Sequence, residues 1–153
     1  MKTIVSMKAQ KGVLLLEAMI AILLFSVGVL AVVGLQANAI KNVAQSKYRS
    51  DAAFLVDQIL GQMWSDRINI GNYVLPSGTS PYVTAWVTQV GAALPNATAA
   101  NAPTITIAPT AYAGPPAYTA YQITVTVYWQ SAEELKAGLA AHKHVTTALI
   151  TCC

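Results

Sequence analysis

The 153-residue sequence is poor in charged residues and has only two cysteines. Charged residues make up 10% of the chain, against roughly 25% in an average soluble protein. Because no clustered positive face is visible, the sequence predicts no nucleic-acid binding. The cysteines, Cys152 and Cys153, are adjacent at the end of the sequence. A normal disulfide joins separated, facing Cα atoms, so the pair does not staple the chain in the usual way, and its state stays open.

Catalytic and metal-binding motifs are also missing. No nucleophile–base signature stands out, so no catalytic residue, no cofactor and no enzymatic activity are predicted. His142 and His144 would share one face of a strand and, with the two terminal cysteines, make the one imaginable set of four zinc ligands. Adjacent cysteines rarely suit a tetrahedral ion, and a Cys-x-x-Cys pair is lacking. The histidines are therefore interpreted as a solvated strand edge, and no metal site is predicted.

One long hydrophobic run dominates what the sequence does contain. Residues 13–35 read VLLLEAMIAILLFSVGVLAVVGL, and Glu17 is their one charge. At about 1.5 Å per residue, a helix of this run spans about 35 Å, enough to cross a hydrocarbon core of about 30 Å. Lys2, Lys8 and Lys11 precede the run, and the other six basic residues are balanced by six acidic ones. Cationic residues on this side predict a cytoplasmic N-terminus.

Three interpretations of the run compete. A discarded secretory signal is favoured by the small residues of 37–39 but opposed by the length of the run, since such signals have roughly 7–15 apolar residues. A plain membrane anchor would make Glu17 an accident, although ionisable groups inside a span are costly and usually functional. In the third interpretation, the carboxylate of Glu17 has a function in this segment.

The third interpretation rests on spacing. If the chain is cut between Gly12 and Val13, a new α-amino group appears at Val13, and Glu17 becomes the fifth residue, about one helical turn in. A carboxylate in apolar surroundings needs a partner. The amine of its own chain or of a neighbouring copy is the nearest cation, and a neighbour's amine would fix the stagger between packed helices. This interpretation predicts Gly12 and Val13 as processing residues and Glu17 as an assembly residue.

The segment KGVLLLE, followed by AMIAILLFSVGVLAVVGLQ, resembles the class III signal and methylation motif of type IV pilins and pseudopilins. In that family, a prepilin peptidase cuts after the glycine and methylates the new N-terminus, which would be Val13 where the family usually has phenylalanine. Residues 25–36 and 49–67 look similar to the PilV minor pilins, the type IV pilus modification proteins. The resemblance is strong over residues 8–67 and weak beyond.

The resemblance implies a non-enzymatic minor pilin, whose partners are prepilin peptidase, other pilins through the N-terminal helix, and the inner-membrane assembly platform. It implies a single pass through the bacterial inner membrane with a periplasmic head, and later a place in the pilus at the cell surface. Adhesion, twitching motility or DNA uptake are family-level implications. Two alternatives stay open: a type II secretion pseudopilin, and an exported periplasmic domain with a discarded signal.

Taken as a whole, the sequence predicts four regions and an α+β fold. These are a leader, 1–12, cleaved after Gly12; a membrane-spanning half-helix, 13–36; an amphipathic half-helix, 37–67; and a β-rich head, 68–153. The amphipathic half carries an apolar stripe at helical spacing, expected to pack on a small antiparallel sheet in a pilin-like arrangement. The stripe consists of Ile40, Ala44, Tyr48, Ala52, Leu55, Ile59 and Met63. The acidic residues of the amphipathic half, Asp51, Asp57 and Asp66, are interpreted as solvated.

Within the head, residue types and periodicity predict four strands. The best of them, residues 118–129, alternates apolar and polar side chains with period two. Residues 82–90, 104–108 and 143–151 are also expected as strands, with loops at 68–81, 91–103 and 109–116. Helical residue types at 131–141 predict a helical turn in a connection.

Overall fold

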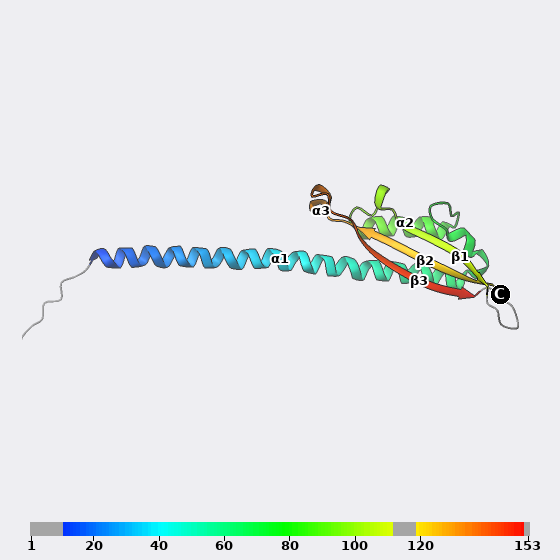
Figure 1. Cartoon of the computed structure of the whole chain (residues 1–153), viewed down its shortest axis with the longest axis horizontal. Helices are drawn as coiled ribbons and strands as arrows, with labels where there is room; N and C mark the ends of the chain where they lie inside the picture. Colours follow the sequence, from blue (N-terminus) through cyan, green and yellow to red (C-terminus); the bar gives the residue numbers. More distant parts are fainter. Residues whose placement is uncertain (1–10, 112–118, 152–153) are drawn as a thin grey trace, which may run out of the picture. The chain divides into compact units, whose positions relative to one another are not determined.

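The computed structural model of the chain describes residues 11–111 and 119–151 and divides the chain into two units, 1–44 and 45–153. The α-helices and strands, shown in Figure 1, are α1 (Lys11–Ser65), α2 (Pro81–Ala93), β1 (Thr104–Ala111), β2 (Thr119–Trp129), α3 (Ala132–Lys136) and β3 (His142–Thr151). Two 3-10 helices, η1 (Arg67–Tyr73) and η2 (Ala99–Asn101), lie in the connections. The predicted leader lies almost wholly outside the described residues.

The described part of the first unit is helical throughout. It holds the N-terminal part of α1, and the side chains of residues 13–43 are all exposed. The helix is long and apolar enough to cross a membrane. A helix that is hydrophobic all round is stable when it is buried, either in a protein core or in a membrane. The length and composition of this segment are therefore compatible with a membrane-spanning helix.

The second unit is built on a three-stranded antiparallel sheet in the order β1-β2-β3. In its register, Val125 of the central strand lies opposite Ile105 on one side and Thr146 on the other. The alternation predicted for β2 is confirmed from Ile123 to Trp129, where every odd-numbered residue is buried. Ala120 and Thr126, on the other face of the strand, are buried as well. The long helix and the antiparallel sheet confirm the α+β class.

The core of this unit lies between α1, α2 and the sheet. From Ala52 to Met63, the stripe of α1 is buried as predicted, whereas Ile40, in the first unit, is exposed. The indole of Trp86 on α2 donates a hydrogen bond of 2.7 Å to the backbone carbonyl of Leu55. This bond satisfies a buried donor and fastens α2 to α1.

The strand predicted for residues 82–90 is wrong, because this segment lies within α2. Its β-branched and aromatic residues favour a strand by composition. Their spacing is nevertheless helical: Val83, Trp86 and Val90 recur every three or four residues and are all buried. Ser80 and Pro81 supply a further helix-start signal, since proline suits the first helical position.

Other boundaries differ by a few residues from the predicted ones. Strand β1 continues to Ala111, three residues into the predicted loop, while residues 112–118 lie outside the described part of the chain. The predicted loop at 68–81 begins with η1 instead. The helical turn after β2 is confirmed as α3, which starts with a capping box: Ser131 and Glu134 each accept a hydrogen bond from the other's backbone N–H.

Candidate functional site

The residues predicted for processing and assembly lie at the start of α1. Helix α1 begins at Lys11, so Gly12, Val13 and Glu17 belong to its first two turns. In an α-helix, residues four apart lie on the same face. Val13 and Glu17 therefore share one face, and a new α-amino group at Val13 would lie within one turn of the carboxylate.

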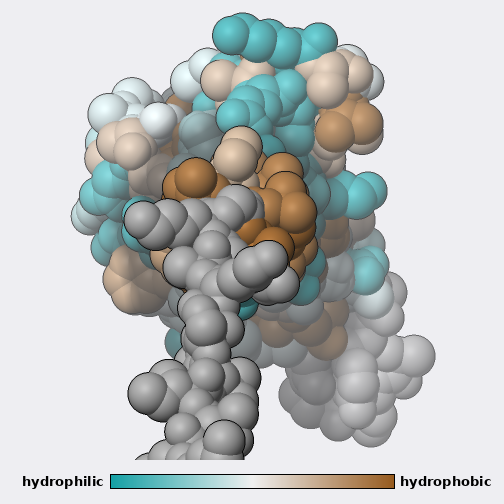
Figure 2. Space-filling view, turned by 90° about the vertical axis from the view of Figure 1, so that its left-hand side faces the viewer, coloured by the Kyte–Doolittle hydropathy of each residue, from teal (hydrophilic) through white to brown (hydrophobic). Residues whose placement is uncertain are grey.

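The surroundings of Glu17 are apolar. The neighbouring Leu16 and Ile20 are 60% and 51% exposed. Figure 2 looks along α1 from its N-terminal end and shows hydrophobic residues (brown) around the helix axis there. Within the described residues, Glu17 makes no hydrogen bond or ion pair. Once a membrane or a packed helix covers this face, the carboxylate needs a cationic partner.

The other polar side chain in this run satisfies itself. The hydroxyl of Ser26 donates a hydrogen bond of 2.7 Å to the carbonyl of Ile22, one turn earlier. Such a bond removes the cost of placing a hydroxyl in hydrocarbon. Ser26 is therefore compatible with a membrane without any partner, and Glu17 is the residue of the run that calls for one.

The two glycines in the span leave open surface on the helix. A Cβ added at Gly28 or Gly34 would have no neighbour within 4 Å. Neither glycine is therefore required by packing inside the described chain. Glycine lets the backbones of neighbouring transmembrane helices approach closely, and these two positions are available for such contacts.

The second unit holds a polar network where α1 enters it. The indole of Trp129 donates to Oε1 of Gln45 over 3.0 Å, and Nε2 of Gln45 donates to Oε1 of Glu134 over 3.0 Å. The same Glu134 oxygen accepts a hydrogen bond from Nε2 of His142 at 2.9 Å. The rings of Trp129 and His142 are stacked, with centroids 5.7 Å apart. Four residues from α1, β2, α3 and β3 are thereby joined.

Electrostatics of the network centre on Glu134. The hydrogen bond from His142 and the backbone N–H of Ser131 stabilise the ionised carboxylate and lower its pKa from 4.5 to about 2. This network was not predicted from the sequence, although the Ser-x-x-Glu spacing at 131–134 is a recognisable capping signal.

The solvated positions expected for histidines and aspartates are confirmed only in part. His142 is exposed, as expected, although Nε2 is hydrogen-bonded to Glu134 and the ring is stacked on Trp129. His144 is half-buried, with Nε2 3.1 Å from the hydroxyl of Thr146. Asp66 is also half-buried, and its carboxylate accepts hydrogen bonds from Asn69 and from the hydroxyl of Tyr73. Asp57 is exposed, as expected. Among the described residues, no group of three or more histidine, cysteine and acidic side chains is placed to hold a metal ion.

Comparison with known proteins gives no relative. No protein-family model matches the chain, and no curated protein or solved structure is significantly similar to it.

Proposed function

We propose that this chain is the precursor of a minor pilin of a type IV pilus, of the PilV kind. In this proposal a prepilin peptidase cuts between Gly12 and Val13 and methylates Val13. The protein sits in the bacterial inner membrane through α1, with a cytoplasmic N-terminus and a periplasmic head, and then joins or primes a pilus. It has no catalytic activity of its own.

The observation that carries the proposal is the position of Glu17. It stands four residues after the proposed new N-terminus, on the same helix face, in a segment whose side chains are exposed all round. An ordinary anchor gains nothing from a carboxylate there, because an ionisable group inside a span is costly unless it is paired. In a polymer, the carboxylate has a use: pairing with the α-amino group of a neighbouring subunit specifies the axial stagger of packed helices.

The composition of the span supports assembly through helix packing. Its side chains are almost all aliphatic, so contacts between copies or with other pilins replace contacts with lipid at little cost. The glycines at 28 and 34 permit close approach of such helices. The head keeps its own buried core without the first unit, which suits a subunit whose head is displayed while its helix is packed away.

Substitution of Glu17 tests the pairing. We expect Glu17→Ala to insert into the membrane normally and to be absent from sheared pili, measured by immunoblotting of membrane and pilus fractions. Ser26→Ala is the matched control, since Ser26 lies in the same span and bonds only to its own helix. Glu17→Ala subunits recovered from pili at the parental level would show that the pairing is not needed.

Two alternatives give different outcomes in the same cells. A type II secretion pseudopilin would be processed identically, but its deletion would abolish secretion and leave pili intact. An exported periplasmic domain with a discarded signal would start at Asn38 or Ile40 and would be recovered from the periplasm without detergent.

A further inference from the structure

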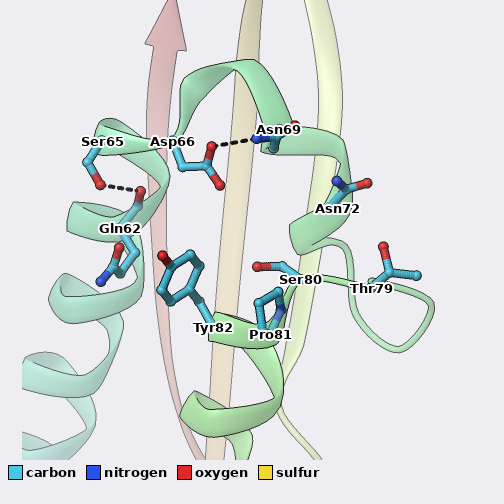
Figure 3. Close-up of a pocket in the computed structure, with 9 residues that line it drawn as sticks. All are labelled: Gln62, Ser65, Asp66, Asn69, Asn72, Thr79, Ser80, Pro81 and Tyr82. Atoms are coloured by element: carbon cyan, nitrogen blue, oxygen red, sulfur yellow. Dashed lines mark hydrogen bonds between the residues drawn. The ribbon is translucent and has the colours of Figure 1, made fainter.

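A polar pocket lies in the second unit where α1 ends and α2 begins (Figure 3), with a volume of about 570 Å³. This size falls in the range of roughly 300–1,000 Å³ that is typical of small-molecule sites. The lining comes from the end of α1, from η1, from the loop that leads into α2 and from the first residues of α2. It consists of Gln62, Ser65, Asp66, Asn69, Asn72, Thr79, Ser80, Pro81 and Tyr82.

The wall of the pocket is fixed by internal contacts. Asp66 lies between α1 and η1, and its carboxylate is held by the side-chain amide of Asn69 at 2.8 Å and by the hydroxyl of Tyr73 at 3.1 Å. The backbone N–H of Ser80 donates to the carbonyl of Asn72 over 3.1 Å and closes the loop. Gly78 lets this loop turn tightly, because a Cβ there would lie 2.5 Å from the Asn72 carbonyl oxygen. The pocket is therefore formed before any ligand arrives.

Hydrogen-bonding groups in the pocket are unused. Within the described residues, the side chains of Gln62, Asn72 and Thr79 have no hydrogen-bond partner. Each carboxylate oxygen of Asp66 holds one hydrogen bond and retains capacity for another. The side-chain amides supply a donor and an acceptor side by side, each hydroxyl can donate and accept, and the carboxylate only accepts. This mixture matches a ligand made of hydroxyl groups, each of which donates and accepts.

The lining also excludes other ligand classes. It has no lysine, arginine or histidine, so a phosphate or nucleotide would find no countercharge. It has only one carboxylate, whereas a divalent cation prefers several charged oxygen ligands. It has no aliphatic side chain other than that of Pro81, so a lipid tail would bury little apolar surface. A neutral polar molecule remains.

Tyr82 supplies the apolar contact that a sugar ring needs. Its side chain is 50% exposed and borders the space below Asp66 in Figure 3. A pyranose ring has polar edges and faces of C–H groups, and an aromatic side chain with a polar tip offers a surface to such a face.

We propose that this pocket binds one neutral saccharide unit, free or at the end of a glycan. Gln62 and Asn72 donate hydrogen bonds to the ring hydroxyls and accept hydrogen bonds from them, Asp66 only accepts, and Tyr82 contacts the C–H face. Because the one charge of the lining is negative, a neutral hexose or N-acetylhexosamine binds better than a sugar acid.

Nuclear magnetic resonance titration of the full chain tests this binding. The protein is kept in an amine-oxide detergent, because glucoside and maltoside detergents present sugar headgroups. The probes are the methyl glycosides of glucose, galactose, mannose and N-acetylglucosamine, with glucuronic acid and sialic acid as charged counterparts. We expect at least one neutral sugar to shift the side-chain amide signals of Gln62 and Asn72, and the acids to shift them less. The titration extends to a sugar concentration of about 0.1 M, so that weak binding is also detected. If none of the neutral sugars shifts these signals at that concentration, the proposal is overturned.

Variants locate the binding. Asn72→Ala and Tyr82→Ala change exposed side chains without touching the bond between Asp66 and Tyr73, and each is expected to weaken binding about tenfold. Gln89→Ala is the matched control, since this exposed amide on α2 is absent from the lining. Equal affinity of Asn72→Ala and Gln89→Ala would place the sugar elsewhere and contradict the proposal. Binding of the protein to an immobilised glycan that ends in the preferred sugar would show that the pocket takes a terminal unit, and absence of such binding would show that it takes only the free saccharide.

Discussion

The indole N–H of Trp129, near the end of the central strand, donates a hydrogen bond to the side-chain oxygen of Gln45, the first residue of the second unit. The amide of Gln45 in turn donates to Glu134. The side chain of Gln45 thus bridges an aromatic donor and an ionised acceptor. It secures α1 at the edge of the hydrophobic core.

We expect a double-mutant cycle to reveal this bridge. Trp129→Phe and Gln45→Ala each remove one partner, and the smaller ring of phenylalanine also leaves a cavity. The coupling free energy between the two changes should be about 0.5–1.5 kcal/mol, since the cycle cancels the cavity and retains the hydrogen bond. Guanidinium unfolding of the four proteins in one detergent, followed by circular dichroism, measures it. Additive effects of the two substitutions would mean that the bond contributes no stability.

The lowered pKa of Glu134 predicts a specific dependence of stability on pH. Because its pKa falls from 4.5 in the unfolded chain to about 2 in the folded protein, the ionised carboxylate stabilises the fold fully above pH 4.5. This contribution is lost as the pH falls from 4.5 to about 2. The free-energy difference between the parent and Glu134→Gln should therefore shrink across this window.

Asp57→Asn is the control for that titration, because Asp57 is an exposed carboxylate of α1. Its difference from the parent should stay small at every pH. Unfolding free energies measured at half-unit steps of pH test both variants. A gap between the parent and Glu134→Gln that is constant from pH 6 to pH 2 would contradict the assigned role of the carboxylate.

Gly78 is expected to be irreplaceable in the loop before α2. A Cβ at this position would lie 2.5 Å from the Asn72 carbonyl oxygen and closer still to that of Val74. Gly78→Ala should lower the free energy of unfolding by about 1–3 kcal/mol, because the backbone has to move. Gly71→Ala is the matched control, since a Cβ there has no neighbour within 4 Å, and its effect should stay within about 0.5 kcal/mol. Equal midpoint temperatures of thermal unfolding for the two variants would contradict this role of Gly78.

The elements with a strong periodic pattern were predictable from the sequence. Helix α1 combines a long apolar run with an apolar stripe at helical spacing, and the central strand alternates with period two. The boundaries of both elements in the structure lie within two residues of those expected. Helix α2 was not predicted because its composition and its spacing disagree. Valine, tyrosine and tryptophan favour strands, but the apolar spacing of Val83, Trp86 and Val90 lets one helical face be buried against α1.

The two polar assemblies of the head depend on tertiary contacts and were beyond prediction. Gln45, Trp129 and His142 are far apart in the sequence, and no spacing rule connects them. The saccharide pocket likewise assembles polar residues that, in the sequence, resemble an ordinary loop. By contrast, the roles proposed for Gly12 and Glu17 rest on local spacing along one helix, and for this reason the sequence alone was enough to single them out.

The mature N-terminus is the most direct test of the account. Mass spectrometry of the protein purified from membranes should find a chain that begins at Val13, carries a methyl group on its α-amine and retains the whole apolar segment. In cells that lack prepilin peptidase, the same chain should keep its leader. A mature protein that begins at Asn38 or Ile40, without the segment that contains Glu17, would contradict the proposal of a pilin that assembles through α1.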